Sequence, residues 1–315
     1  MKTNKTKAPL DRARADRLRR LATHASVAIG LSLAGTKLAA WIVTDSVTVL
    51  SSLLDSSVDV VASVIILISV RQALRPPDRS HRFGHGKAEP LGALAQAAFI
   101  ASSGLFLVFQ AVDRLIDPAP VEAPAVGIAV MSFSIVATTG LVLLQRYVIR
   151  ATGSLAIAAD SLHYKGDLLT NLSVIATLVV FQLTGIVWID PVVGIAIAAY
   201  LLINAVNVGR DAFHMLMDRE LPQEDRDRIK AIDQADPRVE GLHELRTRSS
   251  GTNRFIELHL ELDGSMTLDA AHDIADAVET ALRQAFPDAA IIVHQEPAGL
   301  DDERLDHTIH RNRRV

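Results

Sequence analysis

The chain contains no cysteine among its 315 residues. This absence excludes disulfides, thiolate ligands and thiol redox chemistry, so any bound metal must be held by histidine, aspartate or glutamate. Aromatic residues make up only 4% of the chain, the formal net charge is −4, and no basic patch is interleaved with aromatic residues. We therefore expect no nucleic-acid partner.

Long apolar runs dominate the first two thirds of the chain. Hydrophobic residues make up 49% of the sequence, and they cluster in runs of about 20 residues, each long enough to cross about 30 Å of hydrocarbon as a helix. This clustering favours a membrane protein over a soluble one. It predicts six transmembrane helices at about 22–43, 48–70, 91–113, 125–147, 154–183 and 187–208.

Lysine and arginine are concentrated at one side of these predicted helices. The N-terminal arm is basic and lacks the apolar core of a cleavable signal peptide, and we expect it to attach to anionic lipid at the inner surface. The 71–90 connection is rich in arginine, whereas the opposite connections contain only Arg114. The positive-inside rule therefore predicts that both termini are cytoplasmic.

Two pairs of ionisable residues interrupt the apolar runs: Asp55 with Asp59, and His163 with Asp167. A charged residue near the centre of a membrane helix costs about 2.5 to 3.5 kcal/mol on insertion scales, so such residues usually have a function. The i, i+4 spacing places both members of each pair on one helix face. Three carboxylates and an imidazole form a tetrahedral ligand set suited to a zinc-like ion.

Each of these residues, considered by itself, has another interpretation. A lone aspartate can pair with a basic residue of a neighbouring helix, and a lone histidine can bond a backbone carbonyl. Lys165 lies beside the second pair, but one cation cannot neutralise three carboxylates, so protons or a divalent cation are needed. Asp160 is expected at the cytoplasmic mouth of this site, either as an access ligand or as a solvated charge.

A second group of candidate ligands lies between the second and third predicted helices. Asp78, His81 and His85 are spaced by three and four residues. A loop of this kind can fold around one metal with an open fourth coordination position. The alternative is that all three are solvated polar residues.

Past residue 210 the composition changes to mixed charged and apolar residues, which indicates a soluble domain. A helix to about 234, strands at 242–248 and 255–262, a helix at 268–286 and a strand at 290–294 are predicted. This order favours a compact α+β domain with two helices on one face of a small sheet. The charged tail that follows is expected to be disordered.

Five ligand-type side chains lie in this predicted domain. Considered alone, His259 and His272 would be ordinary surface residues. Their number in so small a domain predicts a shared metal site, although sequence spacing does not show that they converge. The five are His243, His259, His272, His294 and Glu296.

Three motifs resemble those of the cation diffusion facilitator family, and especially of its bacterial zinc and iron efflux members. The resemblance extends over about 22–297. The motifs are Leu-Leu-Asp-Ser-Ser-Val-Asp at 53–59, His-Arg-Phe-Gly-His-Gly-Lys-Ala-Glu at 81–89 and Asp-Ser-Leu-His-Tyr-Lys-Gly-Asp at 160–167.

The resemblance implies a homodimer in the bacterial inner membrane that exports divalent metal in exchange for protons. Zn²⁺ would be both transported and structural, with Cd²⁺ and Fe²⁺ as alternative ions. The implied fold is six transmembrane helices plus a cytoplasmic α+β domain of metallochaperone-like, ferredoxin-like fold. The expected layout is a basic arm at 1–21, a six-helix domain at 22–208, a metal-binding cytoplasmic domain at 209–298 and a tail at 299–315.

Site roles follow from the same resemblance. Asp55, Asp59, His163 and Asp167 would form the transport site, and Asp78, His81 and His85 the loop site. His243, His259, His272, His294 and Glu296 would hold cytoplasmic metals, with Glu296 standing where the family pattern has the shorter aspartate. Lys87 and Asp218 would form a charge interlock at the membrane surface, unless they are ordinary snorkelling or capping charges.

The resulting hypothesis is alternating access, in which protons compete with metal for the same ligands. His163 is the expected carrier of one exchanged proton, because imidazole titrates near neutral pH. The rival function is that of a non-transporting membrane metal sensor, which would not need four ligands inside the membrane. An enzyme is disfavoured because the chain has no His-Glu-x-x-His motif.

Overall fold

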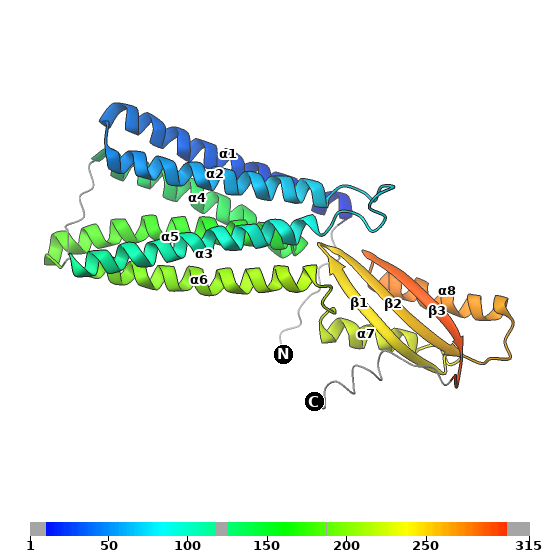
Figure 1. The fold of residues 1–315 in the computed structure, drawn as a ribbon. Helices are drawn as coiled ribbons and strands as arrows, with labels where there is room; N and C mark the ends of the chain where they lie inside the picture. The colour runs from blue at the N-terminus through cyan, green and yellow to red at the C-terminus, as the bar shows by residue number, and fades with distance from the viewer. Residues whose placement is uncertain (1–10, 118–124, 187, 301–315) are drawn as a thin grey trace. The chain divides into compact units, whose positions relative to one another are not determined.

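The computed structural model describes residues 11–117, 125–186 and 188–300 (Figure 1). The chain divides into two compact units, Met1–Phe213 and His214–Val315. The first ten residues of the basic arm, and the predicted tail from 301 onward, lie outside the described residues.

The first unit contains six helices that are long and apolar enough to cross a membrane, which confirms the six predicted transmembrane helices. The first of them begins at Arg12, well before its apolar run, because the basic segment continues as helix. The six are α1 Arg12–Thr44, α2 Val47–Ala73, α3 Ala88–Ile116, α4 Ala125–Thr152, α5 Leu155–Thr184 and α6 Ile189–Leu216.

The start of α5 is fixed by the turn that precedes it. Gly153 ends α4 with a φ of +67°, a conformation that glycine adopts without steric cost. Ser154 then caps α5, since its hydroxyl accepts from the backbone N–H of Ile157 at 3.3 Å. The same hydroxyl donates to the buried Glu89 carboxylate at 2.5 Å, which ties α5 to α3.

Buried hydroxyl groups tie α5 to the first two helices. The Tyr164 hydroxyl donates to the backbone carbonyl of Ser26 at 2.9 Å, and the hydroxyls of Tyr164 and Ser63 are 2.9 Å apart. An added Cβ at Gly30 would lie 3.1 Å from the Tyr164 hydroxyl oxygen. These contacts fix the part of α5 that carries the predicted ligands His163 and Asp167.

The second unit is an α+β domain with the predicted order of elements. The strands form one sheet in the order β1-β2-β3, with β1 antiparallel and β3 parallel to β2. Its elements are α7 Gln223–Asp233, β1 Gly241–Ser250, β2 Asn253–Leu262, α8 Leu268–Ala285 and β3 Ala289–Pro297.

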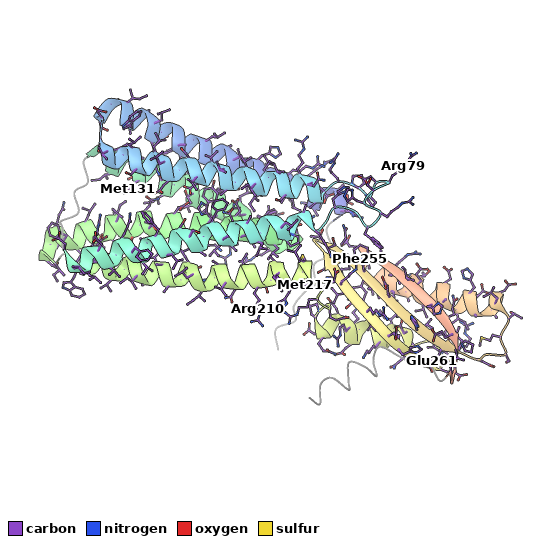
Figure 2. The ribbon with its side chains drawn as sticks, in the orientation of Figure 1. Arg79, Met131, Arg210, Met217, Phe255 and Glu261 are labelled. Carbon is purple, nitrogen blue, oxygen red and sulfur yellow. The ribbon has the colours of Figure 1, made fainter. Side chains whose placement is uncertain are left out.

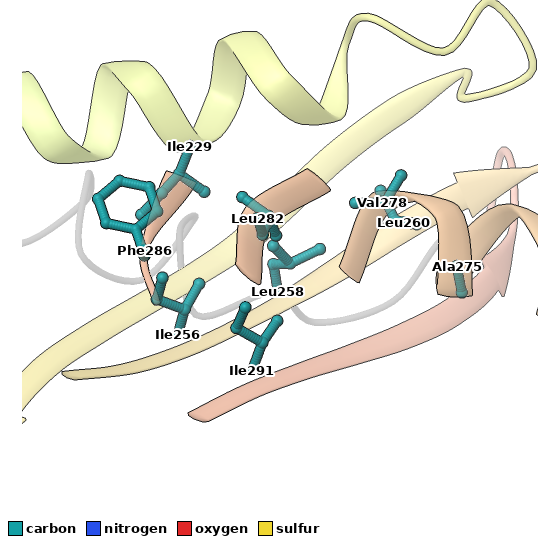
Figure 3. Close-up of a cluster of buried hydrophobic side chains, with 9 residues drawn as sticks. All are labelled: Ile229, Ile256, Leu258, Leu260, Ala275, Val278, Leu282, Phe286 and Ile291. Carbon is teal, nitrogen blue, oxygen red and sulfur yellow. The ribbon is translucent and has the colours of Figure 1, made fainter. Parts of the chain in front are cut away.

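The core of this domain lies between the sheet and its two helices (Figure 3). Alternate residues of β2 point into it, because successive side chains of a strand face opposite sides. The intervening β2 residues, His259 among them, therefore lie on the face away from the helices. The core consists of Ile229, Ile256, Leu258, Leu260, Ala275, Val278, Leu282, Phe286 and Ile291.

Asp233, at the end of α7, is fully buried, and neither of its carboxylate oxygens has a hydrogen-bond partner in the described part of the chain. Burial raises the pKa of this carboxyl to about 7. The pKa of an aspartate in an unfolded chain is about 3.9. Between these values the folded domain keeps a proton that the unfolded chain has lost, so this group lowers stability as pH rises from about 4 to about 7.

We predict that Asp233→Asn stabilises the C-terminal domain at pH 8 by on the order of 2 to 4 kcal/mol and has little effect near pH 4. Urea unfolding followed by circular dichroism at several pH values measures this. Asp236→Asn is the matched control, because Arg238 lowers the pKa of Asp236 to about 2, so its loss should destabilise the domain above pH 4. Parallel pH profiles for the native and Asp233→Asn chains would contradict the account.

Candidate metal sites

The first candidate site lies inside the transmembrane bundle, between α2 and α5. The Nε2 atom of His163 is 3.0 Å from Oδ1 of Asp59 and 3.8 Å from Oδ2 of Asp167. One ligand atom from each of these residues lies within 4.8 Å of the others. The histidine is buried, whereas the side chains of Asp59 and Asp167 keep 23% and 34% of their surface exposed. Two carboxylates and an imidazole are therefore positioned to hold one ion.

Asp55, the fourth predicted ligand, is not brought into this group. It is exposed, one turn before Asp59 on the same helix. Its i, i+4 spacing from Asp59 keeps it on the ligand face of α2.

Lys37 is a second basic residue within the spans, and the charge count made from the sequence left it out. Its ammonium group donates to the Ser56 hydroxyl at 2.6 Å and to the Ser52 carbonyl at 3.2 Å. Ser56 lies between Asp55 and Asp59 along α2, so a positive charge from α1 reaches the edge of the candidate site. Two lysines still cannot neutralise three carboxylates.

Asp160 is buried rather than solvated, which corrects one of the two interpretations made from the sequence. Only 1% of its surface is exposed. Its Oδ2 accepts hydrogen bonds from the Ser26 hydroxyl at 2.6 Å and from the Gln145 amide at 2.8 Å. Asp160 thus links α1, α4 and α5 one turn away from His163.

The second candidate site is the loop between α2 and α3, part of which is marked by Arg79 in Figure 2. Asp78 bridges the two histidines: its Oδ1 is 3.2 Å from Nδ1 of His81, and its Oδ2 is 3.3 Å from Nε2 of His85. The two imidazole centroids are 4.5 Å apart. A φ of +82° at Gly84 lets the chain turn between the histidines.

Backbone N–H groups stabilise the charged form of the Asp78 carboxylate, which is the form that binds a cation. The N–H of His81 donates to its Oδ1 at 2.7 Å, and the N–H of Ser80 donates at 2.9 Å. These hydrogen bonds, the first above all, hold the pKa of Asp78 below its usual range. The loop therefore presents a deprotonated ligand at any physiological pH.

The third candidate site lies on the open face of the C-terminal sheet. Strand register aligns one histidine from each strand, because His243 pairs with His259 and His259 pairs with His294. Adjacent imidazole centroids in this row are 5.2 and 4.8 Å apart. The sheet itself therefore brings together three predicted ligands that are far apart in sequence.

Glu296 is the carboxylate that joins this row. Its Oε1 is 2.8 Å from Nδ1 of His259 and 3.3 Å from Nε2 of His294, and its Oε2 is 3.1 Å from Nε2 of His243. The longer glutamate side chain thus reaches all three imidazoles. His243, His259 and Glu296 form the tightest group, with one ligand atom of each within 4.8 Å of the others.

Glu261 is a carboxylate at this site that the sequence analysis missed. Its Oε1 is 2.9 Å from Nδ1 of His243, on the imidazole edge opposite Glu296. Figure 2 labels Glu261 near the C-terminal end of β2. Strand alternation could have identified Glu261 from the sequence, because it is two residues after His259 and therefore lies on the same strand face.

His272 is not brought to the histidine row within this chain. It is exposed on α8, and α8 packs on the sheet face that carries the core residues Leu258 and Leu260. The thickness of the sheet therefore separates His272 from His259.

Lys87 and Asp218 belong to different units of the chain. Lys87 is the residue before α3, and Asp218, with a φ of +54°, accepts a hydrogen bond from Arg248 at 3.4 Å. The interlock between Lys87 and Asp218 stays a prediction.

Comparison with known proteins assigns the family. Residues 23–217 match the family model of the cation efflux transmembrane domain, and residues 221–298 match that of the cytoplasmic domain of cation efflux proteins. The chain belongs to the cation efflux family, and its C-terminal α+β domain is the cytoplasmic domain of that family.

Similar proteins include two described as cation-efflux pump FieF. The one from Shewanella oneidensis is 46% identical over 282 residues, which cover 90% of this chain and 95% of that protein. The one from Klebsiella pneumoniae is 42% identical over 284 residues, covering 89% and 93%. The solved structure of the metal-bound C-terminal domain of the CzcD transporter from Thermotoga maritima is 28% identical, with a TM-score of 0.25, and covers 26% of this chain and all of that domain.

We predict that Glu261→Gln weakens zinc binding by the C-terminal domain by about 10- to 100-fold, because a carboxylate that orients a ligating histidine usually contributes that much. Competition with a chromophoric chelator measures the affinity. Glu257→Gln is the matched control, since Glu257 is also two residues from His259 but on the other side along β2. Equal affinities for the two variants would show that Glu261 does not orient His243.

Proposed function

We propose that this protein exports divalent metal ions, zinc foremost, across the bacterial cytoplasmic membrane in exchange for protons. Family membership and the names of its relatives as cation-efflux pumps support efflux of a metal cation. The observation that carries the proposal is the convergence of Asp59, His163 and Asp167 between α2 and α5.

The ligand set supports zinc as the preferred cargo. Carboxylate oxygens and one imidazole nitrogen fit tetrahedral Zn²⁺, and the chain has no thiolate that would favour softer ions. Cd²⁺ and Fe²⁺ are further cargo for the same ligands. Asp55 completes the set when metal is bound, which gives four protein ligands and no open coordination position.

Proton exchange follows from the chemistry of these ligands. Carboxylate and imidazole bind metal only when deprotonated, so metal and protons compete for the same atoms. When the site faces the more acidic side, protonation releases the metal. When it faces the cytoplasm, deprotonation allows the next ion to bind. His163 carries one of the exchanged protons, because the same imidazole nitrogen can hold either a proton or the metal.

The placement of the ligands on two helices supports alternating access. Asp59 belongs to α2 and His163 and Asp167 belong to α5, so a relative movement of these helices opens the site to one side at a time. Both termini are cytoplasmic in this proposal, consistent with the positive-inside rule. The loop and the cytoplasmic sites then lie on the side from which metal is collected.

The cytoplasmic domain binds metal and joins two copies of the chain. His243, His259, His294 and Glu296 hold zinc there, and His272 lies on a different exposed surface where a second copy could complete its coordination. Binding of metal by this domain favours the dimer and biases the conformational equilibrium of the membrane unit.

We predict zinc uptake into everted-orientation proteoliposomes loaded with a zinc-sensitive dye when the interior is made acidic, because internal protons displace the transported metal. Asp59→Ala should reduce the initial rate by more than tenfold, since it removes the ligand 3.0 Å from His163. Stopped-flow fluorescence with and without the pH gradient measures both effects.

The matched control is Asp113→Ala, which removes an exposed aspartate of α3 outside all three ligand groups. It should transport like the native chain. A native protein that is folded and binds zinc through its cytoplasmic domain, yet shows no flux, would overturn the transport proposal and favour a metal sensor. Flux that is unaffected by the pH gradient would overturn proton exchange alone.

A further inference from the structure

A groove between α1 and α2 contains two adjoining cavities of about 530 and 320 Å³. Both are lined by Arg20 of α1 and Arg71 of α2. The first also includes Ile68 and Arg75, and the second includes Leu67 and Val70. The groove therefore has one cationic end and one apolar end, and its lining includes no ligand of the three groups.

On each of the two helices the groove spans the point where apolar residues give way to basic ones. In α1 this boundary falls between Arg20 and Leu21, and in α2 it falls between Val70 and Arg71. The two boundaries lie at the same level, because Ala22 and Val70 belong to one buried cluster. In a membrane, this level separates hydrocarbon from the headgroup region.

The cationic end is built for an anion. Three guanidinium groups border the cavities, from Arg20 of α1, Arg71 of α2 and Arg75 just after α2, and no aspartate or glutamate is among the described residues that line them. Arg75 is held by the Gln72 side chain, to which it donates at 3.1 Å. Guanidinium groups form paired hydrogen bonds with phosphate oxygens.

The apolar end is built for hydrocarbon. Leu67 and Val70 line one cavity, and Ile68, which lines the other, is 61% exposed. Exposed side chains of this kind contact acyl chains when the helices are in a bilayer. A soluble phosphate would use only the guanidinium end and leave this surface uncovered.

We propose that this groove binds an anionic phospholipid, with its phosphate between Arg20 and Arg71 and an acyl chain along Leu67 and Ile68. A zwitterionic lipid carries an ammonium group that the arginines repel, so the site selects for net negative headgroups. The bound lipid connects the first two helices at their basic ends, and α2 carries Asp59. The site thus stabilises the pair of helices against which the transport ligands on α5 pack.

The test is the thermal unfolding of the purified full-length protein in neutral detergent, with phosphatidylglycerol or phosphatidylcholine added. Phosphatidylglycerol should raise the unfolding temperature of the native chain by several degrees more than phosphatidylcholine does. The double variant Arg20→Gln/Arg71→Gln should lose most of that difference. Arg75→Gln, a single change at an exposed residue, should lose part of the difference between the two lipids. This variant replaces the double variant in the test if the double variant does not fold.

The matched control is Arg146→Gln/Arg150→Gln. These exposed arginines of α4 lie at the same level, since Val148 between them belongs to the same buried cluster as Ala22 and Val70, but they do not line the groove. This variant should keep the full phosphatidylglycerol effect. Equal loss in both double variants would overturn the proposal in favour of unspecific attraction. Inorganic phosphate or glycerol phosphate that reproduces the effect would assign the groove to a soluble anion instead.

Discussion

The contact between His163 of α5 and Asp59 of α2 is the interaction on which the transmembrane unit depends. Carboxylates within membrane helices are tolerated only when a cation or proton neutralises them. Here the imidazole is 3.0 Å from one carboxylate and 3.8 Å from another. Buried hydroxyl contacts from Tyr164 to Ser63 and Ser26 hold α5 in place beside α1 and α2. One imidazole cannot balance several carboxylates, so protons or a metal ion must supply the remaining positive charge.

The three ligand groups use one chemistry in three physical settings. Each combines carboxylate with imidazole, but the membrane group joins two helices, the loop group is organised by backbone hydrogen bonds to Asp78, and the cytoplasmic group is aligned by strand register. The loop and the sheet fix their ligands through local backbone structure. The membrane group depends instead on how two helices pack, which is the property that a transporter must change during its cycle.

Helical spacing was sufficient to predict the six apolar helices and the face shared by His163 and Asp167, because both depend on local periodicity. Alternation along β2 likewise predicted the strand that carries His259. The alignment of His243, His259 and His294 was not predictable, since register between strands depends on tertiary pairing. The separation of His272 from that row was predictable from the same alternation, because Ile256, Leu258 and Leu260 mark the sheet face that α8 covers, opposite His259. Lys37 and Glu261 were readable from the sequence and were overlooked.

The most direct test of the central claim is X-ray absorption at the zinc edge on full-length protein whose other two groups have been removed by His81→Ala, His85→Ala, His243→Ala and His259→Ala. The account predicts one zinc per chain, with oxygen ligands and a single imidazole at about 2.0 to 2.1 Å. It also predicts that Asp59→Ala in this background abolishes binding. Zinc surrounded by several imidazoles, or no zinc in a folded protein, would contradict a metal site between α2 and α5.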